Sequence, residues 1–265
     1  MLEDKPRSRG RPPTHQVDRL RTRLWFHAIT LQSGLTSGYA VEMAVDGDLV
    51  RKRAHDVSRP RKWDQYRDGD KVPDDKRISR NAIDQAEEFY PGTAALFRSP
   101  MWRVLRGERI DRYEIDSGLR TIPGANRLLF EREAREGEQL PRMRPFDNEV
   151  TGGLLAMADF HSLAATVLMC ALSEEIASPE LREEALRLYA GLRIPLSEKP
   201  LFKPFFPELY SRIDAVCRHW VFLSNSQRME VLIPSKGAMP DQSHRFTHDP
   251  AILRIHLPIP GFDEE

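Results

Sequence analysis

The sequence has little cysteine, no net charge and no apolar run that could cross a membrane without interruption. Only two of its 265 residues are cysteines, which is too few for a disulfide scaffold or a structural zinc ribbon. Forty basic residues balance forty acidic ones, so the chain as a whole is not a cationic protein of the histone kind. The first residues lack the apolar segment of a secretory signal, and we expect a cytoplasmic protein.

Recognisable catalytic motifs are also missing. The chain contains no Gly-x-Ser-x-Gly elbow, no phosphate-binding loop and no cysteine–histidine nucleophile pattern, so we expect neither an enzyme nor a bound cofactor. His244 and His248 have the spacing of two metal ligands on a helix. Pro240 and Pro250 bracket them and no third ligand is evident, so a metal-dependent hydrolase remains only an alternative.

Helical patterns dominate what is present. Apolar residues recur at three- and four-residue steps from Val17 to Leu31, as on one face of a helix. Residues 152–172 are almost continuously apolar but are interrupted by Asp159 and His161, which favours a buried core helix over a membrane span. We therefore predict a mainly α-helical fold with few or no strands, residues 252–257 being one candidate strand.

The composition shifts along the chain and suggests three parts. Residues 1–16 lack apolar periodicity and predict a flexible basic arm. A helical domain is expected at 17–136, followed by a proline-containing linker at 137–147 and a second helical domain at 148–265.

The overall neutrality conceals a charge asymmetry. Residues 1–80 contain 18 Lys and Arg against 12 Asp and Glu, a net charge of +6, and the remainder carries the opposite charge. Such a division is typical of a chain with one region that faces a polyanion. The alternative is that the surplus arginines only solvate one face of an ordinary domain.

The N-terminal arm carries a short basic motif, Pro6-Arg7-Ser8-Arg9-Gly10-Arg11-Pro12. It resembles an AT-hook, in which an Arg-Gly-Arg-Pro core lies along the narrow minor groove of A·T-rich DNA. The negative potential of that groove attracts guanidinium groups, and glycine permits a close backbone approach. The resemblance implies that Arg7, Arg9 and Arg11 contact DNA; the other interpretation is a solvated tail.

A second resemblance covers residues 17–93. A helix ending at Ser33-Gly34-Leu35, a capped helix at Thr36–Asp46 and the spacing of Tyr66, Gly69 and Pro73 resemble a helix-turn-helix regulator of the lambda-repressor type. The chain departs from that family by inserting a polar stretch after the second helix, where the family has a tight turn. The alternative is a small helical domain in which Trp63 and Tyr66 are core residues and the arginines are solvated.

Together the two resemblances imply a DNA-associated protein, such as a transcriptional regulator or an accessory DNA-binding factor, with duplex DNA as its partner. The residues that would contact DNA are Arg7, Arg9, Arg11, Arg59, Arg61, Lys62, Gln65 and Arg67. The competing hypothesis is a helical interaction or structural protein that acts through its C-terminal half. A homo-oligomer is compatible with either function, and no membrane association is expected.

Overall fold

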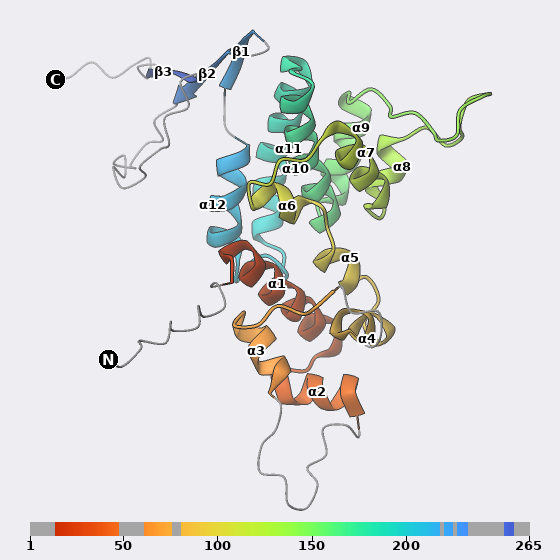
Figure 1. Cartoon of the computed structure of the whole chain (residues 1–265), viewed down its shortest axis with the longest axis vertical. Helices are drawn as coiled ribbons and strands as arrows, with labels where there is room; N and C mark the ends of the chain where they lie inside the picture. The colour runs from red at the N-terminus through yellow and green to blue at the C-terminus, as the bar shows by residue number, and fades with distance from the viewer. Residues whose placement is uncertain are drawn as a thin grey trace, which may run out of the picture. The chain divides into compact units, whose positions relative to one another are not determined.

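The computed structural model divides into two compact units, Met1–Arg98 and Ser99–Glu265, referred to below as unit 1 and unit 2 (Figure 1). The part of the chain that it describes comprises residues 14–47, 61–75, 81–217, 220–224, 227–232 and 252–256.

Five helices make up the described part of unit 1. They are α1 (Gln16–Ser33), α2 (Gly38–Asp46), α3 (Lys62–Asp68), α4 (Ala82–Phe89) and α5 (Thr93–Phe97). Gly34 ends α1 in the left-handed conformation that glycine tolerates, and Ser37 caps α2, both as the sequence predicts. Pro73 followed by Asp74 and Asp75 is typical of the first turn of a helix, so the sequence predicts that a helix opens there. The structure instead begins α4 at Ala82, where the Asn81 side chain accepts a hydrogen bond from a first-turn amide.

The core of unit 1 forms around α1. This helix packs against α3 and α5, while α2 packs against α3 and α4. Leu24, Trp25 and Ile29 on the inward side of α1 are fully buried, which confirms the apolar stripe that the sequence predicts. Two helices that are distant in sequence, α1 and α5, therefore share one core.

Unit 2 begins with short helices and ends with a small sheet. Its described elements are α6 (Met101–Leu105), α7 (Arg112–Thr121), α8 (Ala125–Leu129), α9 (Asn148–Met157), α10 (Phe160–Glu175), α11 (Pro179–Ser197), α12 (Phe206–Val216), β1 (Trp220–Ser224), β2 (Gln227–Leu232) and β3 (Ile252–His256). Strand β2 lies between the other two, antiparallel to β1 and parallel to β3. The mainly α-helical fold is confirmed, and β3 coincides with the strand expected near residue 252.

The central element of unit 2 is α10, which contacts α6, α7, α8, α9, α11 and α12. It forms the second part of the apolar segment 152–172, which the sequence predicts to be a single helix. The structure divides that segment because Ala158 adopts a left-handed conformation (φ 40°) and Asp159 caps a new helix. The burial expected of this segment is confirmed in α10, whereas Leu155 of α9 is exposed. None of the helices described is both long enough and apolar enough to traverse a bilayer.

The division into units differs from the expected domains at 17–136 and 148–265. The structure divides at Arg98, whereas α7 and α8, which precede the expected linker, pack against α9 and α10, which follow it. A β-bridge between Phe130 and Met143 closes the base of the intervening loop. The linker is therefore a surface loop within one unit, because apolar helices on both sides of it share a core.

Two helices are also shorter than predicted. The sequence predicts one helix at residues 126–136 and a last one at residues 207–223. In the structure the first ends at Leu129 and the second at Val216. Trp220, predicted to face inward on that last helix, begins β1.

Candidate functional site

An aromatic cluster fixes the orientation of α3, the helix that carries three of the eight candidate DNA contacts. Trp63 and Tyr66 are buried, and both rings contact that of Trp25, with ring centroids 5.7 and 5.9 Å apart. Phe97 completes the cluster, 5.5 Å from Trp25. The alternative that Trp63 and Tyr66 are core residues is thus confirmed, and the opposite side of α3 faces outward.

A carboxylate joins the end of α2 to the start of α3. Asp46 accepts hydrogen bonds from the Trp63 indole N–H at 2.7 Å and from Lys62 Nζ at 2.8 Å. At the other end of α2, Gly38 is so close to α3 that a Cβ atom there would lie 2.7 Å from the backbone nitrogen of Asp64. The two helices therefore pack directly, despite the polar stretch inserted between them.

The structure describes four of the eight predicted DNA contacts; Arg7, Arg9, Arg11 and Arg59 lie outside the described residues. Of the four, Arg61 and Gln65 are exposed, and Arg61 makes no ion pair within the described ranges. Lys62 is paired with Asp46, as described above.

Arg67 is paired within its own helix. Its guanidinium lies 2.8 Å from Asp68 and 3.7 Å from Asp64. The hydrogen bond from Arg67 holds the pKa of Asp68 below its usual value. Arg61 and Gln65 are therefore better placed than Lys62 and Arg67 to meet an external partner.

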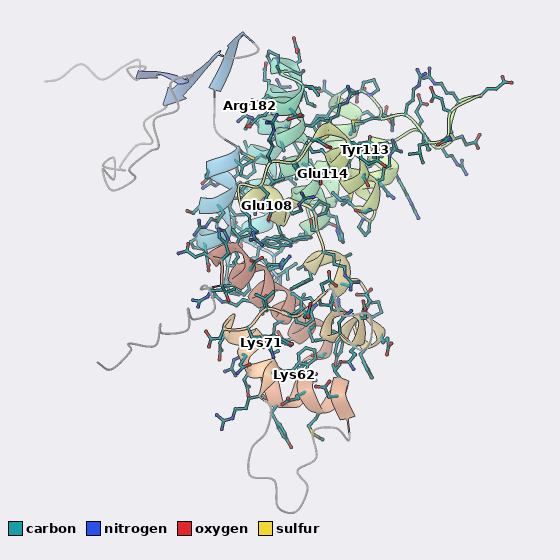
Figure 2. The ribbon with its side chains drawn as sticks, in the orientation of Figure 1. Lys62, Lys71, Glu108, Tyr113, Glu114 and Arg182 are labelled. Atoms are coloured by element: carbon teal, nitrogen blue, oxygen red, sulfur yellow. The ribbon has the colours of Figure 1, made fainter. Side chains whose placement is uncertain are left out.

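Three cations that the sequence analysis did not select lie beside the end of α3. Gly69, just after α3, packs against α1, where a Cβ atom would lie 3.2 Å from the Arg19 carbonyl oxygen and 3.0 Å from Arg23 Cδ. Arg19 and Lys71 are exposed and make no ion pair with any residue that the structure describes. Figure 2 marks Lys62 at the start of α3 and Lys71 shortly after its end. Only the fold could reveal that these cations of α1 are close to α3.

The basic surplus of the first 80 residues is unevenly placed. Segments 1–13, 48–60 and 76–80 carry a net charge of +7, and they lie outside the described residues. The described remainder of residues 1–80 carries a net charge of −1. Any strong polyanion binding by unit 1 must therefore draw on these three segments.

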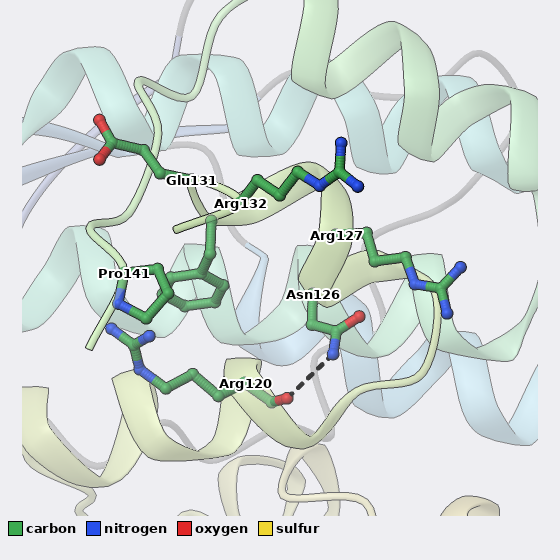
Figure 3. A pocket seen from close by; sticks show the side chains of 7 residues that line it. Arg120, Asn126, Arg127, Glu131, Arg132 and Pro141 are labelled. Carbon is green, nitrogen blue, oxygen red and sulfur yellow. Dashed lines mark hydrogen bonds between the residues drawn. The ribbon is translucent and has the colours of Figure 1, made fainter. Parts of the chain in front are cut away.

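A second candidate site is a hollow in unit 2, with a volume of about 580 Å³. Figure 3 shows it between the end of α7, helix α8 and the loop that follows α8. The residues that line it include three arginines, an amide and two apolar side chains: Arg120, Arg127, Arg132, Asn126, Phe130 and Pro141.

The arginines flank the hollow rather than meet at one point. In Figure 3 the Arg120 guanidinium lies beside Pro141, whereas those of Arg127 and Arg132 extend on the other side of the hollow. Arg120 also lies over the Phe130 ring, 4.1 Å from its centroid, in a cation–π contact. An arrangement of this kind is suited to an extended anion rather than to a metal ion.

The remaining sequence candidates carry no catalytic arrangement in the described part of the chain. Asp159 is the half-buried N-cap of α10 and accepts a hydrogen bond from the Ser162 amide at 2.8 Å, so its carboxylate serves to cap the helix. Burial lowers the pKa of the neighbouring His161. His244 and His248 lie outside the described residues, so their metal binding stays a prediction.

Metal-ligand types do not gather elsewhere in the described ranges. Among these residues, no group of three or more histidine, cysteine, aspartate or glutamate side chains is placed to hold a metal ion. No protein-family model, curated protein or solved structure matches this chain, so the geometry above is the basis for assigning a function.

Proposed function

We propose that the chain binds duplex DNA through unit 1, in the role of a transcriptional regulator or an accessory DNA-binding factor. The observation that carries the proposal is the orientation of α3. Its aromatic side is buried against Trp25, and Asp46 holds its first turn, so that Arg61 and Gln65 are left on the outside. A rigid helix with a polar outer side can enter a groove with little ordering cost.

Charge supports the same proposal. The basic segment 48–60 leads directly into α3, and the basic segment 76–80 lies between α3 and α4. Together with the N-terminal arm they would neutralise phosphates, while α3 would contact base edges. Most of the affinity is then electrostatic and independent of sequence.

The test is fluorescence anisotropy of a labelled duplex of about 20 base pairs, titrated with the full chain over a series of salt concentrations. We expect log K to fall linearly with log salt, with a slope near −0.9 for each phosphate neutralised. Replacing Arg51, Lys52 and Arg53 together by alanine should weaken binding and make the slope shallower by about 1 to 3.

Two further variants separate the parts of the proposal. Arg9→Ala with Arg11→Ala should remove a preference for A·T-rich duplexes, since those arginines are assigned to the minor groove. Arg61→Ala should weaken binding more than Arg67→Ala, because Arg67 is already paired with Asp68.

The matched control is Arg187→Ala, which removes an exposed arginine of unit 2 that is paired with Glu183. It should leave the isotherm unchanged. If the full chain shows no measurable affinity for any duplex at low salt, or if the triple variant binds like the parent, the proposal is wrong.

A further inference from the structure

The hollow of unit 2 carries uncompensated positive charge. Arg127 and Arg132 are exposed, and neither forms an ion pair with another residue in the described part of the chain. Most other described arginines of unit 2 do have a carboxylate partner, as Arg103 has in Glu108 and Glu114. Two guanidinium groups without such partners therefore flank the same hollow.

The one carboxylate at the hollow is already engaged. Glu131 lines it, but its carboxylate lies 2.7 Å from the guanidinium of Arg135. That hydrogen bond lowers the pKa of Glu131, so the carboxylate stays ionised and paired. In Figure 3 it points away from Arg127 and Arg132, and hence does not neutralise them.

Contacts within unit 2 hold the residues around the hollow in place. The Arg120 guanidinium is held in place by Asp116, at 2.7 Å, and by the face of Phe130. The loop base is pinned by two backbone hydrogen bonds of 2.8 Å, from the Glu131 amide to the Arg142 carbonyl and from the Arg144 amide to the Leu129 carbonyl. Little ordering of the backbone would be needed on binding.

Size and lining define the ligand class. A volume of about 580 Å³ exceeds what an inorganic ion needs and falls within the usual range for small organic ligands. Guanidinium groups bind phosphate oxygens through paired N–H donors, and Phe130 and Pro141 supply apolar wall. We propose that this hollow binds a small organic phosphate, of about the size of a mononucleotide, through Arg127 and Arg132. This site is separate from the DNA contacts assigned to unit 1.

Isothermal titration calorimetry of the full chain tests the proposal, with adenosine monophosphate and pyrophosphate as probes and adenosine as the uncharged comparison. Adenosine monophosphate should bind with a Kd below about 1 mM and more tightly than pyrophosphate, and adenosine should not bind. The double variant Arg127→Ala/Arg132→Ala should weaken that binding at least tenfold.

The matched control is Arg109→Ala/Arg112→Ala. Both of these arginines are exposed, lack an ion pair within the described residues and do not line the hollow. This control should bind the phosphate probes as tightly as the parent does. The Arg127→Ala/Arg132→Ala protein should bind duplex DNA as the parent does. Circular dichroism confirms that each variant is folded.

Three outcomes would overturn the proposal: adenosine monophosphate does not bind, adenosine binds as well as its monophosphate, or the two double variants weaken binding equally. None of these outcomes depends on whether unit 1 binds DNA.

Discussion

The Sγ atoms of Cys170, in α10, and Cys217, at the end of α12, lie 3.4 Å apart. They are the only cysteines of the chain, and both are buried. The hydrogen bond between them, followed by burial, raises the pKa of Cys217, which disfavours the reactive thiolate form of that residue.

Prolonged treatment with diamide, which accepts the two thiol hydrogens, is expected to join Cys170 and Cys217 in an intramolecular disulfide. The bond would close a loop spanning 47 sequence positions. It should raise the free energy of unfolding by about 2–4 kcal/mol through its constraint on the unfolded chain. Non-reducing mass spectrometry detects the disulfide, and urea unfolding measures the change in the free energy of unfolding. Cys170→Ala is the control that cannot form the bond. Two free thiols persisting in the treated, folded protein would contradict this expectation.

Tyr66 predicts a pH dependence of stability. Burial, with smaller contributions from Asp46 and Asp74, raises its pKa from 10.0 to about 12. Because the folded state favours the neutral phenol, this contribution is fully present below pH 10 and is lost as the pH rises towards 12. Tyr66→Phe should therefore flatten the fall in unfolding free energy over that range, measured by urea unfolding at a series of pH values. If the free energy of unfolding depends on pH in the same way in Tyr66→Phe and in the parent, Tyr66 is not the cause of the fall.

Asp46 should matter more for stability than an exposed ion-paired aspartate. Asp46→Ala leaves the buried indole N–H of Trp63 without its acceptor and removes the partner of Lys62, at a cost of about 2–3 kcal/mol. The matched change is Asp68→Ala, which breaks only an exposed pair with Arg67 and should cost under about 1 kcal/mol. Chemical denaturation compares the two, and equal losses would show that Asp46 does not fix α3.

Two glycine substitutions should have opposite signs. Gly38→Ala places a Cβ atom 2.7 Å from the Asp64 backbone nitrogen, so α2 and α3 must separate and stability should fall by about 1–3 kcal/mol. Gly152→Ala, in α9, meets nothing within 4 Å and should stabilise the chain by about 0.5–1 kcal/mol. Thermal unfolding measures both, and a neutral Gly38→Ala would mean that the helices are not in close contact.

Local signals in the sequence were sufficient to predict several helices. The apolar stripe that starts at Val17 and the Ser37 cap both appear as expected, because each depends on residues within a few positions. Ser178-Pro179, a helix start that is equally local in the sequence, likewise opens α11. The Asp159 cap was missed, although its capping box with Ser162 is equally local. The apolar composition on both sides of Asp159 concealed the break.

Contacts between distant residues could not be predicted in this way. The pairing of Lys62 with Asp46, the approach of Gly69 to Arg23 and the hollow between α7 and α8 all depend on how helices pack. The expected domain boundary failed for the same reason, because a proline-containing loop has a similar composition within a domain and between two domains. Sequence charge likewise could not show that Arg67 has an internal partner.

The position of α10 has a consequence for how unit 2 comes apart. Since this one helix contributes to the packing of α6, α7, α8, α9, α11 and α12, withdrawing α10 would expose apolar surface on all six. Loss of α10 should therefore be cooperative, so that limited proteolysis removes the helices of this unit together rather than trimming them one by one.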